Sequence, residues 1–317
     1  MNRNKTVIVV AALLIILIAV LTAGCGQTQL TKVNDNDKEQ SQEFPKTIVD
    51  DMGREVVINK QPQRIVSLAP SNTEILFALE LTDQIVGVTE YCNYPEEALT
   101  KTKVGSFSEP NIEKIVELEP DLVFATSMHK KTVEQLEKLD ISVFVVNPSN
   151  ISEIINSIKK VGDATGRSEA AGQLTADMQS RIEAVKEKTE KLKEEDKPLV
   201  YYELWDDPVM SAGPGSFVDS LITLAGGINL AGDAEGKYPK LSEEVVIERN
   251  PDIIIHQYDH GSNKIENIAD RPGWQNITAI KQGKIYGIDP DIVNRPGPRI
   301  VDALEKFFEY IHPELAK

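Results

Sequence analysis

The sequence predicts an α/β protein made of two similar lobes that are joined by one long helix. Three observations lead to this prediction. Segments typical of strands and of helices alternate along both halves of the 317-residue chain. A long charged segment, which lacks Gly and Pro over residues 173–197, separates the halves. One short helix–strand motif also occurs once on each side of that segment.

The joining helix is expected over about residues 168–196. Ser168 is a suitable N-cap with Glu169 in the first turn, and Pro198 ends the segment. One face is apolar, formed by Leu174, Met178, Ile182, Val185 and Leu192. Such a helix spans roughly 40 Å at 1.5 Å per residue, so we expect a rigid strut across two lobes. The alternative is a dimeric coiled coil, for which the apolar repeat is too short and irregular.

The first half contains a hairpin followed by alternating strands and helices. The hairpin is expected over residues 47–58, with Gly53 in its turn. After it, strands are expected at residues 64–68, 85–88, 122–125 and 143–146, and helices at 73–81, 111–118, 133–139 and 152–163. This alternation is typical of a mainly parallel sheet with helices on both faces.

The second half repeats the pattern. Strands are expected at residues 199–203, 252–256 and 285–288, and helices at 216–224, 242–249 and 298–311. A shared motif relates the two halves. Glu113 stands seven residues before Pro120-Asp121, and Glu244 stands seven residues before Pro251-Asp252. Three apolar strand residues follow each Pro-Asp pair, which indicates two similar lobes.

Composition limits the possible functions. The net charge is −16 and the sequence has no basic tract, so nucleic acid is not expected as a partner. Hydrophobic residues make up 41% of the chain, enough for two domains of ordinary size.

Residues 1–24 are interpreted as a lipoprotein signal peptide. Arg3 and Lys5 precede an apolar run of 15 residues, which is short for a transmembrane span. The small residues before Cys25 resemble the bacterial lipoprotein signal, which implies acylation of Cys25; an ordinary secretory signal is the alternative. Residues 25–43 are polar and are expected to form a flexible tether. Cys92 then remains alone, so the fold relies on no internal disulfide.

Several motifs together resemble the class III periplasmic-type solute-binding lipoproteins of ABC importers, the family that captures cobalamin, ferric siderophores and haem. They are RIVSLAPSNTE (64–74), VGSF (104–107), NIE (111–113), EPDLV (119–123), GPGSF (213–217), LAGG (224–227), NPD (250–252) and RPGPR (295–299). The resemblance implies two Rossmann-like lobes, at residues 44–165 and 198–317, joined by one rigid helix within residues 166–197. It also implies only modest lobe motion on binding.

The loops after the strands are the expected walls of the ligand site, because ligands of open α/β sheets lie beyond the carboxyl ends of the strands. In two facing lobes these ends meet across a cleft. The expected ligand-binding residues are Ser71, Asn72, Tyr91, Tyr94, Phe107, Met128, Trp205, Asp206, Phe217, Tyr258, Asp259, Trp274 and Asp291. Flat aromatic faces suit a large planar ligand such as a corrin or porphyrin. The alternative for each aromatic residue is a packing role.

The resemblance is strongest to the cobalamin-binding branch, through residues 90–98 and 104–107. The cleft loops contribute Asp206, Asp259 and Asp291, against Arg271, Arg295 and Arg299 as the main basic candidates. This balance favours a neutral or cationic ligand, so cobalamin is expected, with a ferric siderophore or haem as the alternative. No cofactor is expected. A bare-metal site is not expected either, because the chain has only four His.

An enzyme is the rival class of protein. The sequence contains no motif of a serine hydrolase, zinc protease or P-loop NTPase. Asp206 and Asp259 are conceivable as an acid–base pair, but nothing in the sequence places them at the required separation. We therefore expect a binding protein.

The resemblance also implies partners. In this family one exposed Glu on each lobe docks onto arginines of the permease, and Glu113 and Glu244 occupy the matching positions. The expected partners are an ABC permease with its ATPase, a small-molecule ligand, and a membrane reached through the lipid anchor. The protein is expected to be a monomer on the extracytoplasmic side of the cell membrane.

Overall fold

The structure is a computed structural model that describes residues 44–257 and 268–316. The chain divides into residues Met1–Gln42 and a compact body from Glu43 to Lys317, and the description below concerns this body. The predicted signal peptide, Cys25 and the tether lie outside the described residues, as do Tyr258 and Asp259.

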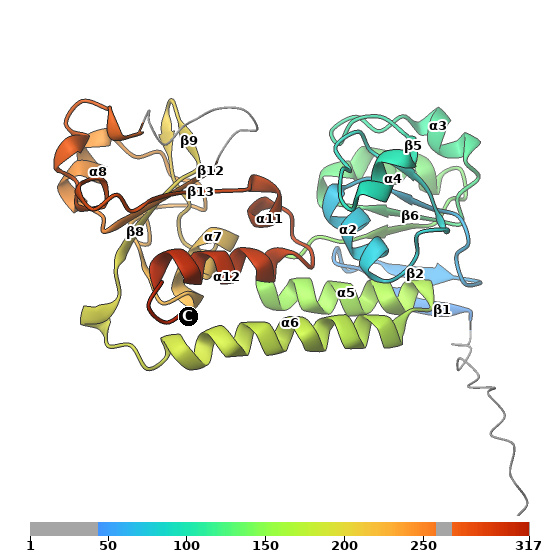
Figure 1. The fold of residues 1–317 in the computed structure, drawn as a ribbon. Coiled ribbons are helices and arrows are strands. Elements are labelled where there is room, and N and C mark those ends of the chain that lie inside the picture. Colours follow the sequence, from blue (N-terminus) through green and yellow to red (C-terminus); the bar gives the residue numbers. More distant parts are fainter. Residues whose placement is uncertain (1–43, 258–267, 317) are drawn as a thin grey trace, which may run out of the picture. The chain divides into compact units, whose positions relative to one another are not determined.

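The N-terminal lobe is built on a parallel five-stranded sheet (Figure 1). Its strand order is β5-β4-β3-β6-β7, and the antiparallel hairpin β1–β2 forms a separate two-stranded sheet. The strands are β1 (Lys46–Val49), β2 (Glu55–Ile58), β3 (Ile65–Ser67), β4 (Ile85–Val88), β5 (Thr102–Lys103), β6 (Leu122–Ala125) and β7 (Val143–Val145). The helices are α2 (Pro70–Ala78), α3 (Ile112–Glu117), α4 (Lys130–Glu137) and α5 (Ile151–Thr165), with 3₁₀ turns at Glu96–Thr100 and Ser127–His129.

The C-terminal lobe has a parallel four-stranded sheet with the order β11-β8-β12-β13. Its strands are β8 (Leu199–Glu203), β11 (Ile228–Asn229), β12 (Ile253–Gln257) and β13 (Ile285–Ile288), and β9 (Trp205–Asp206) pairs with β10 (Val209–Met210) as a small hairpin. The helices are α7 (Phe217–Leu224), α8 (Glu243–Arg249), α10 (Thr278–Lys281), α11 (Pro290–Asn294) and α12 (Ile300–Ile311), with 3₁₀ turns at Glu194–Asp196 and Trp274–Asn276. The predicted fold class of two α/β lobes and a joining helix is therefore confirmed.

Alternation along the central strands directs side chains into two layers on opposite faces of each sheet. In β6, Phe124 packs toward α2 and α5, while Val123 packs toward α3 and α4. In β8, Tyr202 packs toward α7 and α12, while Tyr201 packs toward Val246 of α8 and Trp274. Continuous apolar runs in these strands are explained by this burial on both faces.

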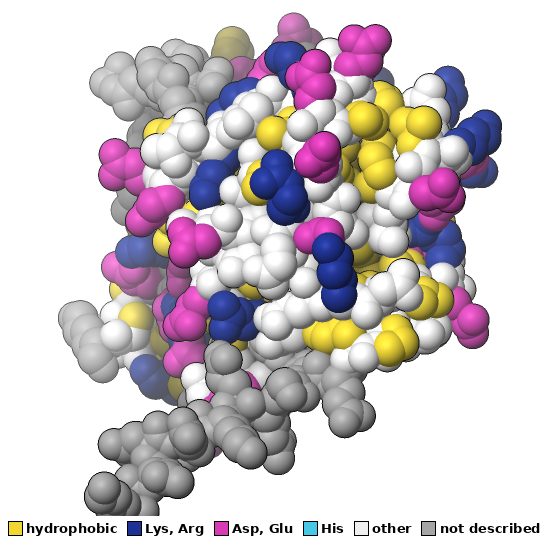
Figure 2. Space-filling view, turned by 90° about the vertical axis from the view of Figure 1, so that its right-hand side faces the viewer, with side chains coloured by type: hydrophobic (Ala, Val, Ile, Leu, Met, Phe, Trp, Pro, Cys, Tyr) yellow, Lys and Arg dark blue, Asp and Glu magenta, His cyan; other side chains and the backbone are white. Residues whose placement is uncertain are grey.

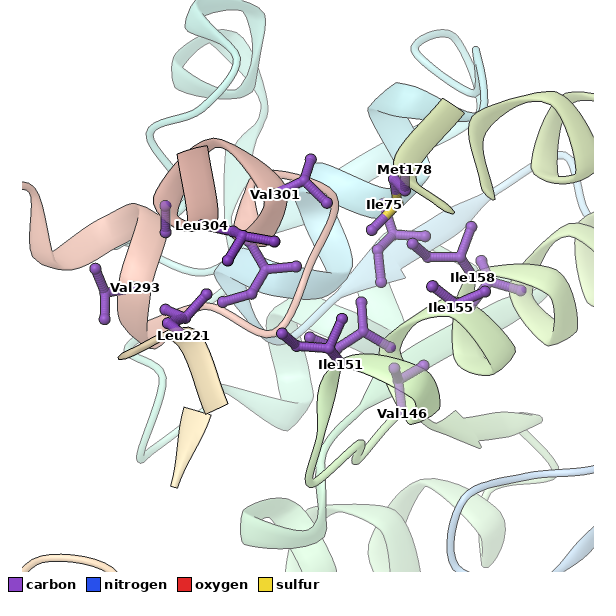
Figure 3. Packing of buried hydrophobic residues seen from close by; sticks show 14 of the residues in the cluster. Ile75, Val146, Ile151, Ile155, Ile158, Met178, Leu221, Val293, Val301 and Leu304 are labelled. Carbon is purple, nitrogen blue, oxygen red and sulfur yellow. The ribbon is translucent and has the colours of Figure 1, made fainter. Parts of the chain in front are cut away.

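One of these layers runs without a break from the first lobe into the second. It joins Ile75 of α2 and Ile155 of α5 to Leu221 of α7 and Leu304 of α12 within a single buried cluster (Figure 3). Met178 of the joining helix belongs to the same cluster. The two lobes therefore share a hydrophobic core.

The joining helix α6 covers Ser168–Thr189 and contacts α5 along one end and α7 and α12 along the other (Figure 1). Arg181 fastens it to α12 by donating hydrogen bonds to Asp302 at 2.6 Å and to Glu305 at 2.6 and 2.8 Å. These bonds to Glu305 raise the pKa of Arg181. The prediction of a strut that lies across both lobes is confirmed.

The ends of α6 differ from the prediction. Arg167, not Ser168, is the N-cap, and the Ser168 hydroxyl donates a hydrogen bond to the Asp163 carboxylate. The helix ends at Thr189 instead of near residue 196. It ends there because the Thr189 hydroxyl donates to the carbonyl of Leu224 at 3.1 Å and Leu192 turns toward Gly226 of the C-terminal lobe. Tertiary contacts thus end a helix that the local sequence would continue.

Charges on the face of the N-terminal lobe that Figure 2 presents are mixed. Acidic and basic side chains are interspersed there, and neither sign forms a continuous field (Figure 2). Such a surface is typical of a solvated face and agrees with the scattered charges of the sequence.

We predict that Gly162 is required for the close approach of α5 and α6. A Cβ at this position would lie 2.4 Å from Cβ of Ala171 and 2.9 Å from the carbonyl oxygen of Arg167. Gly162→Ala should therefore lower the free energy of unfolding by about 1–3 kcal/mol. Gly172→Ala is the matched control in α6, where nothing lies within 4 Å. It should raise stability by about 0.5–1 kcal/mol. Urea denaturation of both variants tests this, and equal stabilities would contradict it.

Candidate functional site

A cavity of about 970 Å³ lies between the two lobes. This volume is near the upper end of the range for small-molecule sites. Its walls come mainly from segments that follow strands: residues after β3, β4, β5, β6 and β7 in the first lobe, and after β8, β10, β11 and β13 in the second. The lining residues are Ala69, Pro70, Ser71, Tyr91, Phe107, Ser108, Thr126, Ser127, Met128, Asn147, Leu204, Met210, Ser216, Phe217, Val218, Tyr238, Asp291, Val293, Asn294, Arg295 and Pro296.

Six of the residues expected from the sequence line this cavity: Ser71, Tyr91, Phe107, Met128, Phe217 and Asp291. The parallel sheets bring them together because the carboxyl ends of their strands point toward the same space. Tyr91 and Met128 are largely exposed, with 65% and 74% of their surface accessible, so their side chains are open to a ligand.

The prediction that Trp274 lines the cleft is wrong. The indole is fully buried on the far face of the C-terminal sheet, 6.0 Å from the ring of Tyr201, and donates a hydrogen bond to Glu243 at 3.2 Å. The segment that looks like a loop in the sequence forms a 3₁₀ turn after Gly273, and this turn directs the large apolar ring into the core.

Four further expected residues do not line the cavity. Asn72 is buried in the first turn of α2, which begins earlier than predicted, and its amide donates to the carbonyl of Ala125 at 3.0 Å. The ring of Tyr94 stacks with the guanidinium group of Arg299, whose central carbon lies 4.0 Å from the centre of the Tyr94 ring. Trp205 and Asp206 are exposed on the β9–β10 hairpin. Tyr258 and Asp259 lie outside the described residues.

Sequence reasoning missed much of the C-terminal wall. Leu204, Met210 and Tyr238 provide apolar and aromatic surface there. Leu204 carries a usable signal, since it directly follows a buried strand. Tyr238 carries a weaker one, an aromatic residue in a loop beside Pro239. Nothing local marks Met210, which is placed by the pairing of β10 with β9.

His129 fastens two parts of the N-terminal wall to each other. Its Nδ1 accepts a hydrogen bond from the backbone N–H of Thr126 at 3.0 Å, and its Nε2 donates to the carbonyl of Phe107 at 2.7 Å. The ring also meets the Phe107 ring edge-on at 5.1 Å. Both ring nitrogens are engaged within the wall, so His129 is not available as a ligand of a haem iron.

The basic candidates are all paired with carboxylates. Arg271 binds Glu203 within the C-terminal lobe at 2.5 and 2.9 Å. Arg295 and Arg299 reach across to the first lobe and bind Glu74 of α2 at 2.6–2.9 Å. Arg295 also binds Asp291 at 2.7 Å. Among the described residues that line the cavity, Arg295 is the one cation, and its charge is compensated.

The two expected docking residues occupy equivalent positions. Glu113 is the second residue of α3, behind the N-cap Asn111, and Glu244 is the second residue of α8, behind the N-cap Ser242. Both side chains are exposed. A hydrogen bond from its own backbone N–H and one from the Ser242 hydroxyl lower the pKa of Glu244. In Figure 1, α3 and α8 lie at the upper ends of the two lobes, on the side away from α6.

Comparison with known proteins establishes the family. Residues 65–292 match the family model described as "Periplasmic binding protein". The ABC transporter substrate-binding lipoprotein YvrC of Bacillus subtilis, itself uncharacterized, is 35% identical over 309 residues, which cover 96% of each chain. This chain belongs to the periplasmic binding protein family of ABC transporters, and the resemblance found in the sequence is confirmed.

Two proteins with solved structures similar to this one are named for different ligands. The periplasmic vitamin B12-binding protein BtuF of Vibrio cholerae is 28% identical with a TM-score of 0.69, and the match covers 81% of this chain and 99% of that one. The periplasmic haem-binding protein RhuT of Roseiflexus sp. RS-1 is 27% identical with a TM-score of 0.71, and the match covers 80% and 99%. Overall similarity therefore does not choose between these ligands.

Membership in this family assigns the general role. The chain is the extracytoplasmic substrate-binding component of an ABC importer, which implies a ligand and a permease, and it is a binding protein rather than an enzyme. Within residues 44–257 and 268–316, no helix is long and apolar enough to cross a membrane.

We predict that His129 makes stability depend on pH. Burial lowers its pKa below the ordinary value near 6.5, although the hydrogen bond to Phe107 acts in the opposite direction. The stabilising contribution of the neutral ring is therefore complete above about pH 6.5 and is lost as the pH falls through the lower pKa of the folded state. The free energy of unfolding should decline more between pH 7.5 and 5 in the wild type than in His129→Gln. Parallel declines in urea denaturation would refute this.

Proposed function

We propose that this protein captures cobalamin or a related corrinoid in the interlobe cavity and delivers it to an ABC permease. The observation that carries the proposal is the character of the cavity wall. It is large and mainly apolar, and its described charged groups compensate each other. Such a wall favours a large ligand without net charge, because an ionic ligand would lose its hydration without gaining an unpaired counter-charge.

The aromatic and polar groups of the wall also suit a corrinoid. Tyr91 and Phe107 from the first lobe, with Phe217 and Tyr238 from the second, offer flat surfaces to a planar macrocycle. Uncharged polar side chains, among them those of Ser71, Asn147 and Asn294, also line the cavity. Hydroxyl and amide groups of this kind match the peripheral amides of a corrin ring.

Haem or a ferric siderophore is the second candidate, supported by the likeness to RhuT and by the same aromatic surfaces. Haem requires an axial ligand for its iron. Among the described lining residues only Tyr91, Met128, Met210 and Tyr238 offer suitable atoms, since His129 is engaged in the wall. The propionates of haem and an anionic siderophore complex also need cations as partners. The charge of Arg295 is already compensated by carboxylates of the protein. Cobalamin therefore ranks first.

We predict one-to-one binding of cyanocobalamin by the signal-less protein with a sub-micromolar Kd in isothermal titration calorimetry. Phe107→Ala should weaken binding by about tenfold, because one aromatic stacking surface is lost. Leu99→Ala, which removes an exposed apolar side chain outside the cavity, is the control and should not change the affinity. Absence of cyanocobalamin binding together with tight binding of haemin would replace this proposal by the second candidate.

We also infer that Glu113 and Glu244 dock the protein onto its permease. Their equivalent places at the start of α3 and α8 put one exposed carboxylate on each lobe. Hydrogen bonds from its own backbone N–H and from the Ser242 hydroxyl lower the pKa of Glu244 and thus favour its charged form. Carboxylates that are paired with arginines across an interface provide orientation as well as attraction.

Glu113→Arg and Glu244→Arg should each reduce corrinoid uptake by at least about tenfold, because like charges would then face each other at the permease. The affinity of the purified variants for cyanocobalamin should stay within about twofold of the wild type. Glu187→Arg, at an exposed position of α6 on the side away from α3 and α8, is the control and should preserve uptake. Weakened ligand binding in the Glu113 or Glu244 variants would defeat the docking assignment.

A lipid anchor completes the proposal. Cys25 follows a lipoprotein-like signal, and the name of the Bacillus subtilis relative describes a lipoprotein. Acylation at Cys25 would hold the mature chain at the membrane through the polar segment 26–43, within reach of the permease.

A further inference from the structure

Four charged side chains form one cluster where the lobes meet beside the cavity. Glu74 of the first lobe accepts hydrogen bonds from Nη1 of Arg295 at 2.9 Å and from Nε and Nη2 of Arg299 at 2.9 and 2.6 Å. Asp291 forms an ion pair with Nη2 of Arg295 at 2.7 Å. Gly297, between the two arginines, brings this loop close to Ser71 of α2.

The cluster is buried and electrically balanced. The side chains of Glu74, Arg295, Arg299 and Asp291 expose 2%, 12%, 15% and 24% of their surface. Two guanidinium groups thus contact two carboxylates, and the charge of a third carboxylate, that of Asp289, also acts on Arg299. Burial alone would lower the pKa of Arg299, but the hydrogen bonds and charge of Glu74 outweigh it and raise that pKa.

Arg295 has little capacity left for a ligand. Besides Glu74 and Asp291, it donates to the side-chain oxygen of Asn93 at 2.8 Å and more weakly to the carbonyl of Tyr91 at 3.4 Å. Arg295 thus makes three hydrogen bonds to protein oxygens and one further ion pair. Arg295, the one cation among the described lining residues, therefore offers a ligand neither an uncompensated charge nor many N–H donors.

Holding the lobes together does not require these ions. The apolar core already runs across the lobes, and buried ion pairs contribute little net stability compared with apolar residues of similar size. A role at the cavity explains better why a nearly inaccessible carboxylate faces two arginines at this place.

We propose that Glu74 is a specificity-determining residue: its carboxylate cancels the positive charge that the 295–299 loop would otherwise present to the cavity, so that the site accepts large neutral ligands and rejects their anionic analogues. The inference rests on the proposed function only in taking the interlobe cavity as the ligand site. Removing one carboxylate makes the cluster more positive by one charge in a poorly solvated position, which would favour an anion.

The test compares two ligands that differ by one charge. Cyanocobalamin is neutral, and its monocarboxylic acid carries a propionate in place of one propionamide. Calorimetry should show that the wild type binds the neutral form more tightly. Glu74→Gln and Asp291→Asn should each shift the ratio of the two Kd values toward the acid by at least about tenfold, which is the effect of one partly screened charge. Asp291→Asn keeps the bonds between Glu74 and both arginines, so it separates charge from lobe contact.

Glu203→Gln is the matched control. Glu203 is equally buried and bonds Arg271, but this pair does not line the cavity, so the ratio should stay as in the wild type. An unchanged ratio of Kd values in both test variants overturns the proposal. A shift in Glu74→Gln alone also overturns it, since a change in lobe geometry and not in charge would then cause the shift.

Failure of the proposed function has a different signature, namely no binding of cyanocobalamin by the wild type. Haemin and its neutral dimethyl ester then provide the same charge comparison. If neither macrocycle binds, sulfate is the probe. It should raise the Tm of Glu74→Gln and Asp291→Asn more than that of the wild type and Glu203→Gln, and equal shifts overturn the proposal.

Discussion

The apolar core shared by the two lobes is the interaction on which the rest of the structure depends. It joins residues of α2 and α5 with residues of α7 and α12 in one buried cluster (Figure 3), and α6 contacts α5, α7 and α12. Because close-packed interiors resist deformation, this core fixes how far apart the carboxyl ends of the two sheets lie. The width of the cavity follows from that spacing. The charged cluster at Glu74 is a second contact between the lobes, and it acts on the electrostatics of the cavity wall rather than on its dimensions.

The same constraint connects ligand capture with docking. Glu113 and Glu244 stand on helices of different lobes, so the spacing of the two carboxylates depends on how the lobes are held. The helix α6 is held to the first lobe by packing on α5 and to the second by Arg181. Together with the shared core, it keeps the spacing of the two carboxylates nearly constant. A permease that recognised both carboxylates would therefore meet a similar surface with or without ligand. Any difference between the loaded and empty forms would come from small adjustments, in agreement with the modest motion that the resemblance implies.

Charge compensation separates the candidate ligands more clearly than overall similarity does. Members of the family with closely similar folds bind vitamin B12 and haem. In this chain the arginines that are candidates for binding an anionic ligand are each held by a carboxylate, Arg271 by Glu203 and both Arg295 and Arg299 by Glu74. The aromatic surfaces would receive either macrocycle. The electrostatics of the wall favour the ligand that needs no counter-charge, because a buried charge is stable only beside its partner.

Local patterns in the sequence determined the class of fold. Alternating strands and helices, the repeated Pro-Asp motif and the segment without Gly or Pro depend on neighbours in the chain, so they indicate two α/β lobes and a joining helix directly. Only the tertiary structure decided where α6 ends, since Thr189 and Leu192 respond to the C-terminal lobe. It also decided that Trp274 is core while Tyr238 and Met210 are wall. The pairing of Glu74 with Arg295 and Arg299 joins residues 221 and 225 positions apart. No local pattern encodes such a pairing, because it exists only once both lobes have packed on one core.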